Sequence, residues 1–179
     1  MICNSIAECI EMQLSGNIKV KCPNDIDMCV QSSDKRSKVK CEEKRKKYIL
    51  NNTQKNHIIA YKMDGGIISE DKSVPNETGK CDFMLVINGE EQKTAILVEL
   101  KGVDVGHGLN QIIETINRYD PFLKTISHVY ARLVVRSSAP QIKATPSYVN
   151  LTKLIYAKNG NVKIFEMQIE EKDTDLECP

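Results

Sequence analysis

Apolar and polar residues alternate along several stretches of the chain with the two-residue period of a β-strand. The clearest alternation covers residues 129–135, and continuous apolar runs at 83–86 and 95–98 are typical of strands that are covered on both faces. The pattern predicts strands at 57–61, 82–86, 95–101, 129–135 and 162–169. A tight turn at Asp64-Gly65-Gly66 also predicts a short strand at Ile67-Ile68.

Three stretches have the three- to four-residue apolar spacing of a helix. Ser5 is a candidate N-cap for a helix through about Leu14. A second helix at 109–119 follows the strand at 95–101 directly. A third helix, with Thr145-Pro146 as its N-cap and first turn, ends at Asn159-Gly160.

Two regions have weak periodic signals. Residues 17–57 contain a turn, a polar run and a basic stretch from Lys35 to Lys47, so we expect part of this region to be loop. The basic stretch fits contacts to phosphates, and it fits a solvated helix face or loop equally well. The acidic residues 171–179 are expected to form a flexible tail.

The predicted order is a helix, a three-stranded meander, a helix, a strand, a helix and a strand. Such alternation favours an α/β fold in which helices cover a mixed sheet. The 179 residues, 41% of them apolar, fit one domain with a real core, which we place at residues 1–170.

The seven cysteines include no C-x-x-C pair, so we expect reduced thiols that are packed as small apolar groups. The first basic residue is Lys19, and no apolar run approaches the roughly 20 residues that span a bilayer. We therefore expect a cytoplasmic protein without a membrane partner. The net charge is only +1, but acids concentrate in residues 61–117 and bases flank them, as in a metal site that grips a polyanion. Solvated faces produce similar blocks.

The chemistry concentrates on two of the predicted strands. Asp82 begins one of them, and Glu99-Leu100-Lys101 ends the next. Glu99 and Lys101 share one strand face, and Leu100 points to the other face and offers its carbonyl near the first. Asp82, Glu99 and this carbonyl are the oxygen ligands that Mg²⁺ takes, and Lys101 beside them can orient or deprotonate a water.

One metal can bridge Asp82 and Glu99 only in one strand register. A hairpin centred between Glu90 and Glu91 sets Asp82 opposite Glu99, with a six-residue connection from Asn88 to Lys93. A two-residue Asn88-Gly89 turn would instead set Asp82 opposite Ala95, roughly 13 Å from Glu99. The functional interpretation therefore predicts the longer loop. The alternative interpretation is a Glu99–Lys101 pair on a solvent face, which a strand with continuous apolar residues disfavours.

Asp82, a sixteen-residue gap, Glu99-Leu100-Lys101 and the helix that follows resemble the PD-(D/E)XK nuclease superfamily over about residues 57–136. Its members have the restriction-endonuclease-like fold, a mixed β-sheet flanked by helices. The stretch from Lys62 to Val105 is similar to small stand-alone bacterial members, some of which act in defence against phage or foreign DNA.

The resemblance implies roles for further residues. The acidic residue on the family's first helix corresponds to Glu8, or otherwise to Glu42 or Glu43, and would be a further metal ligand. Gln111 matches a glutamine on the helix after Glu-x-Lys and would contact substrate, as could His107 at the helix entrance. Two departures are Cys81 in the place of the family's proline and the lack of a Gln-x-x-x-Tyr pattern.

These observations predict a Mg²⁺-dependent nuclease, with Mn²⁺ able to replace Mg²⁺, that acts on DNA rather than RNA. A homodimer is an option because cutting two strands needs two sites. The leading alternative is an inactive module of the same fold that binds nucleic acid or protein, and a third is an unrelated phosphate-handling enzyme.

Overall fold

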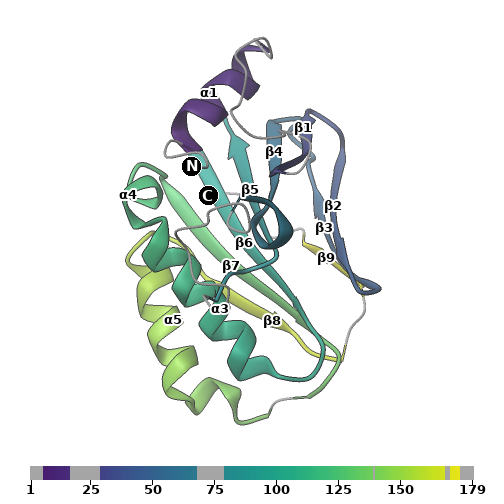
Figure 1. The fold of residues 1–179 in the computed structure, drawn as a ribbon, viewed down its shortest axis with the longest axis vertical. Helices are drawn as coiled ribbons and strands as arrows, with labels where there is room; N and C mark the ends of the chain where they lie inside the picture. The colour runs from purple at the N-terminus through teal and green to yellow at the C-terminus, as the bar shows by residue number, and fades with distance from the viewer. Residues whose placement is uncertain (1–5, 17–28, 68–78, 139, 168–169, 174–179) are drawn as a thin grey trace.

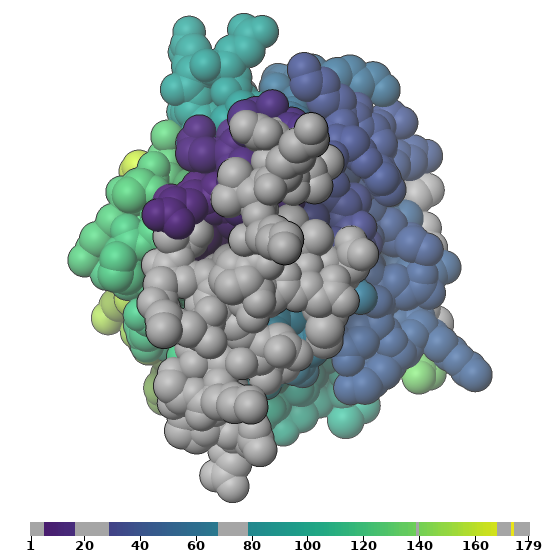
Figure 2. Space-filling view, turned by 45° about the horizontal axis from the view of Figure 1, so that its top comes forward, coloured from purple at the N-terminus to yellow at the C-terminus, as the bar shows by residue number. Residues whose placement is uncertain are grey.

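The structure, a computed structural model, describes residues 6–16, 29–67, 79–138, 140–167 and 170–173. It is an α/β fold in which helices lie on one face of a six-stranded sheet and a small three-stranded sheet lies on the other (Figure 1). The first helix, α1 (Ile6–Ser15), lies between the strands of the N-terminal half and the helices of the C-terminal half (Figure 2). No helix in the described ranges is long and apolar enough to cross a membrane.

The six-stranded sheet is mixed, and its central strands follow the chain order. Neighbouring strands are antiparallel from the first to the fourth and parallel from there to the sixth. The spatial order is β1 (Val30–Asp34), β4 (His57–Lys62), β5 (Phe83–Asn88), β6 (Lys93–Lys101), β7 (His128–Val135) and β8 (Val162–Phe165). The predicted strands at the positions of β4 to β8 are confirmed, although the last one ends at Phe165 and residues 166–167 form a turn. The strand β1 was not predicted, because it lies in the region of weak signals.

The register between β5 and β6 is the predicted one. Met84 pairs with Leu97 and Val86 with Ala95. Asn88 and Lys93 also pair, so the connection is the four residues 89–92 rather than six, closed by a hydrogen bond from the Gly89 N–H to the Gln92 carbonyl (3.1 Å). The register therefore holds although the loop is shorter than expected.

The strands β4, β5 and β6 form the expected antiparallel meander, but the segment between β4 and β5 differs from the short strand expected at Ile67-Ile68. The turn Met63–Ile67 follows β4, with Gly65 at φ +70°, and Ile67 lies in this turn rather than in a strand. Ile68 is outside the described residues. The strand β4 pairs directly with β5, with Ile59 opposite Val86 and Tyr61 opposite Met84.

The helices cover one face of the large sheet, as the periodicity predicts. The chain forms α3 (Val105–Arg118), α4 (Asp120–Leu123), a short turn of helix at Ile142–Ala144 and α5 (Pro146–Tyr156). Asp104 caps α3 by accepting from the His107 N–H (2.9 Å), and Thr145 caps α5. Four cysteines of the described part, Cys9, Cys29, Cys41 and Cys81, are buried free thiols, as expected.

The basic stretch that we expected to be a loop or a helix face forms a hairpin. The strands β2 (Lys38–Glu43) and β3 (Lys46–Asn51) pair in register, with Val39, Cys41, Tyr48 and Leu50 packed on the outer face of the large sheet. Lysines and glutamates occupy the alternate, exposed positions of β2, so the charge obscured a strand alternation. Residues 17–57 were expected to be loop only in part, and residues 38–51 do not belong to that part.

Residues 171–173, which we expected to belong to a flexible tail, instead form part of β9 (Glu170–Asp173), which pairs in parallel with β3. The Asp173 carboxylate is 2% exposed and accepts hydrogen bonds from the Tyr48 hydroxyl (2.8 Å) and from the Arg132 guanidinium on β7. Arg132 is completely buried and stacks over the ring of Tyr130. This buried ion pair fastens the C-terminal strand to the large sheet. The predicted tail at residues 174–179 lies outside the described residues.

Replacing Asp173 by alanine should lower the free energy of unfolding by roughly 3–5 kcal/mol, because it leaves a buried guanidinium without its carboxylate. Urea unfolding at neutral pH measures this change. The double variant Asp173→Ala, Arg132→Leu should recover much of the loss, since it removes the orphaned charge as well. A loss below about 1 kcal/mol for the single variant would show that β9 is not fastened in this way.

Candidate active site

The end of β6 and the residue before β5 meet at one end of the large sheet. The Asp82 N–H donates to Glu99 Oε2 (3.2 Å), and the Leu100 N–H donates to Asp82 Oδ2 (2.6 Å). Glu99 therefore accepts from the backbone of Asp82 itself, and Asp82 accepts from the residue that follows Glu99. Asp82 is 7% and Glu99 1% exposed. The structure thus brings together the two acids that the sequence pattern pairs.

Lys101 lies beside these acids and is held in place by helix α3. Its ammonium group is 3.6 Å from Glu99 Oε1 and donates a hydrogen bond to the Gln111 side-chain carbonyl. The Gln111 amide in turn donates to the Lys80 carbonyl (2.9 Å). A Cβ on Gly108 would lie 3.4 Å from Glu99 Cγ and 3.5 Å from Lys101 Cβ, so α3 packs closely over both side chains. Glu99 and Lys101 therefore share the helix-covered face, as predicted.

Helix α3 also fixes the chain just before Asp82. The Thr115 hydroxyl accepts from the Cys81 N–H (2.9 Å) and donates to the Gln111 carbonyl of its own helix (2.9 Å). Thr115 is completely buried. Sequence reasoning did not single out Thr115; its place four residues after Gln111 on the same helix face was the available signal.

A third carboxylate reaches the site from the small sheet. Glu43, the last residue of β2, shares a side-chain hydrogen bond with Asp82, and its charge acts on Glu99 as well. Of the acids considered for a further ligand, Glu43 is the one whose contacts with the pair are described. Its neighbour Glu42 is exposed and pairs with Lys40 (2.7 Å) instead.

The three remaining candidate site residues are Glu8, His107 and Gln111. Glu8 is on the exposed side of α1, whose residues Ile6, Cys9 and Ile10 face the core, and its assignment as a ligand stays a prediction. His107 is exposed in the first turn of α3. Gln111 is placed to position Lys101, which differs from the direct substrate contact that the resemblance implies.

Burial and mutual repulsion alter the acidity of the cluster. Burial, the charge of Glu99 and the hydrogen bond with Glu43 raise the pKa of Asp82 to about 9. Burial also raises the pKa of Glu99 to about 7, although the positive charge of Lys101 opposes this change. Burial acts to raise the pKa of Glu43, but the hydrogen bond from Asp82 and the ammonium of Lys44 lower it. A proton on Asp82 therefore relieves the crowding of negative charge.

The donor set suits a hard cation, which prefers carboxylate and carbonyl oxygens. Asp82, Glu99, Glu43 and the Leu100 carbonyl could supply such ligands. As the side chains stand, no three or more His, Cys, Asp or Glu residues of the described ranges form a group that could hold a metal ion. In this arrangement Asp82 and Glu99 each turn an oxygen to a backbone N–H, and the raised pKa of Asp82 favours its protonated form. Binding a cation would displace that proton.

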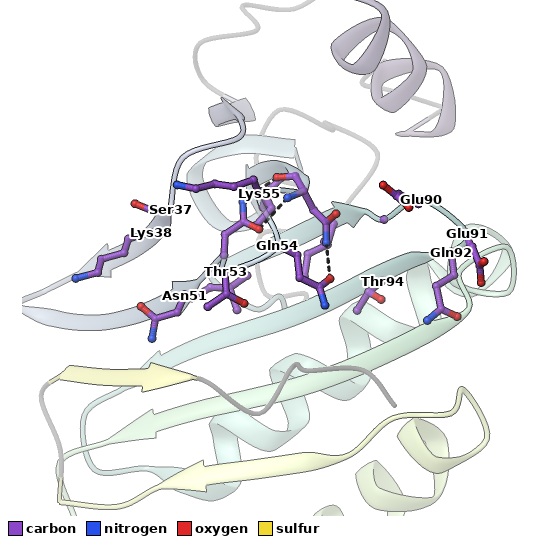
Figure 3. Close-up of a pocket in the computed structure, with 16 residues that line it drawn as sticks. Ser37, Lys38, Asn51, Thr53, Gln54, Lys55, Glu90, Glu91, Gln92 and Thr94 are labelled. Atoms are coloured by element: carbon purple, nitrogen blue, oxygen red, sulfur yellow. Dashed lines mark hydrogen bonds between the residues drawn. The ribbon is translucent and has the colours of Figure 1, made fainter.

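A cavity of about 580 Å³ lies away from the acids, at the other end of β5 and β6. The β3–β4 connection forms one side and residues 90–94 form the other (Figure 3). Ile87 on its wall is five residues from Asp82, roughly 16 Å at the rise of a strand. The Asn52 side chain there is already bonded to the Arg36 and Asn56 carbonyls and to the Asn56 N–H. The hollow and the acid cluster are therefore separate features.

No protein-family model, curated protein or solved structure matches this chain. The function of this chain is therefore inferred from the geometry of the site and from the resemblance of its motif.

The raised pKa of Asp82 makes the stability of the metal-free protein depend on pH. A carboxyl whose folded pKa exceeds its unfolded value stabilises the fold at low pH and loses that contribution as pH rises towards about 9. In EDTA, Asp82→Asn should therefore be more stable than the wild type at pH 9, by on the order of 2 kcal/mol, and nearly equal at pH 4. Urea unfolding at both pH values measures the difference. An equal effect of the substitution at both pH values would contradict the charge argument.

Proposed function

We propose that this chain is a metal-dependent nuclease that hydrolyses phosphodiester bonds in DNA. The main support for this proposal is that Asp82, Glu99 and Lys101 lie in contact at adjoining strand ends, with Glu43 as a further acid. Burying charged groups together in an apolar sheet costs stability, so their presence supports a purpose such as catalysis. The same residues form the motif by which the sequence resembles the PD-(D/E)XK superfamily.

The order of the elements supports membership of that superfamily and its restriction-endonuclease-like fold. From the N-terminus α1 precedes three antiparallel strands, and α3 then leads into the parallel strand β7. This is the order from which the mixed, helix-covered sheet was predicted. The small sheet of β2, β3 and β9 is an addition to that prediction, and it brings Glu43 to the site.

The proposed roles follow from the chemistry of each group. Asp82, Glu99 and the Leu100 carbonyl, helped by Glu43, would hold Mg²⁺ or Mn²⁺, which polarises a phosphate and lowers the pKa of a water. Lys101 orients that water, or takes its proton, and offsets negative charge at phosphorus. Gln111 is a positioning residue, since its side chain joins the Lys101 ammonium to the Lys80 carbonyl.

An inactive module of the same fold is the second candidate function. The hydrogen bond between Asp82 and Glu43 favours it, because a shared proton satisfies both acids without a cation. Such a module would bind nucleic acid or a protein partner, and its acids would serve only the fold. The family resemblance suggests a role of the nuclease in defence against foreign DNA. A homodimer would supply the two sites that cutting both strands needs.

The nuclease proposal predicts a graded loss of DNA cleavage in Mg²⁺ or Mn²⁺. Asp82→Asn, Glu99→Gln and Lys101→Met should each lower the rate by roughly 100-fold or more, because each removes a group that acts on the reacting atoms. Glu43→Gln should lower it by roughly 10- to 100-fold. Cleavage of plasmid and linear DNA, with RNA in parallel, measures these rates.

Glu42→Gln is the matched control, because Glu42 is adjacent to Glu43 but pairs with Lys40 on the exposed face. It should cleave at the wild-type rate within about twofold. Cleavage that survives Asp82→Asn and Lys101→Met would refute the site. Metal-independent DNA binding without any cleavage would establish the inactive module instead.

A further inference from the structure

The turn between β2 and β3 has an unusual sequence for its conformation. Glu43 pairs with Lys46, so Lys44 and Arg45 alone form the turn, and both have positive φ angles, +46° and +67°. Two-residue hairpin turns with positive φ at both positions favour Asn-Gly, because side chains with a full Cβ are strained there. Two long basic residues therefore occupy a turn that the hairpin would form more easily without them.

This strained turn lies beside the acid cluster. Glu43, next to Lys44, is bonded to Asp82, and the Lys44 ammonium is 2.9 Å from Glu43 Oε1. The charges of Asp82 and Asp64 also act on Lys44. The Lys44 side chain is 81% exposed, and Arg45, its neighbour in the turn, is exposed as well, so both side chains are open to a ligand.

We propose that Lys44 and Arg45 bind the phosphates that flank the scissile phosphate of the DNA strand. This inference rests on the proposed function and extends it to substrate binding. Strain that persists in a native turn is often found where a binding site needs it, and here it presents two positive charges next to three carboxylates that would otherwise repel DNA. The hairpin thus carries both an acid of the site, Glu43, and the contacts that hold the polyanion over it.

The test replaces the turn by the sequence that its conformation favours. Lys44→Asn with Arg45→Gly removes both charges, keeps the two-residue turn and so keeps Glu43 in place. Binding of a fluorescent 30-base-pair DNA duplex in EDTA, where no cleavage occurs, is measured by anisotropy between 50 and 200 mM salt. We expect the dissociation constant to rise by about 10- to 100-fold, and the slope of log K against log salt to become less steep by about 1.8, the value for two lost phosphate contacts.

Two controls distinguish the loss of phosphate contacts from a change in net charge or in stability. Lys124→Gln with Lys153→Gln removes the same charge from two exposed lysines near α4 and in α5 and should leave the salt slope unchanged. The turn variant should melt at or above the wild-type temperature because the strain is relieved. If it melts lower, Lys44→Gln with Arg45→Gln, which has the same charge and retains long side chains, is measured in its place.

Wild-type affinity and salt slope in the folded turn variant, together with DNA binding by the wild type, would overturn this inference and leave the proposed function standing. A wild-type protein that neither binds nor cleaves DNA would overturn both.

Discussion

The register of β5 against β6 is the constraint on which the site depends. It sets Phe83 opposite Val98 and so puts Asp82 beside Glu99, where each accepts a hydrogen bond from the partner strand. A slip of one residue would turn every side chain of a strand to the other face. The four-residue loop at 89–92 keeps this register, and a two-residue Asn88-Gly89 turn would not. Asp82 can lie beside Glu99 and Lys101 only because the loop has four residues rather than two.

Two layers then complete the site from opposite sides of the large sheet. Helix α3 packs closely at Gly108 and holds Lys101 through Gln111. The hairpin of β2 and β3 brings Glu43 from the other layer. Together they bury Asp82 and Glu99 near one lysine and bring the half-buried Glu43 to them, which explains why Asp82 keeps a proton well above the usual pKa of an aspartate. Under the proposed function, the same burial that crowds the charges would also supply oxygen ligands for a cation.

Much of this architecture follows from local sequence signals. The strands β4 to β7 and the three longer helices were predictable because apolar periodicity and caps act locally. The β5–β6 register was predicted instead from the requirement that Asp82 meet Glu99, against the local Asn88-Gly89 turn signal. The hairpin of β2 and β3 was not, because lysines and glutamates on its exposed face hid the alternation of Val39, Cys41, Tyr48 and Leu50. The acidic strand β9 was missed for another reason, since it is stabilised by long-range contacts, namely its pairing with β3 and the bonds of Asp173 with Tyr48 and Arg132. Glu43 remained one of three options because its place depends on that unpredicted hairpin.

The central claim is that the acids at these strand ends hold a divalent cation. An anomalous difference map from a crystal soaked in Mn²⁺ at pH 8 tests it most directly. The account predicts a peak within coordination distance of the Asp82 and Glu99 carboxylates and the Leu100 carbonyl, with the Asp82–Glu43 hydrogen bond broken. A map with no peak there at a saturating Mn²⁺ concentration, and with that hydrogen bond intact, would contradict the account.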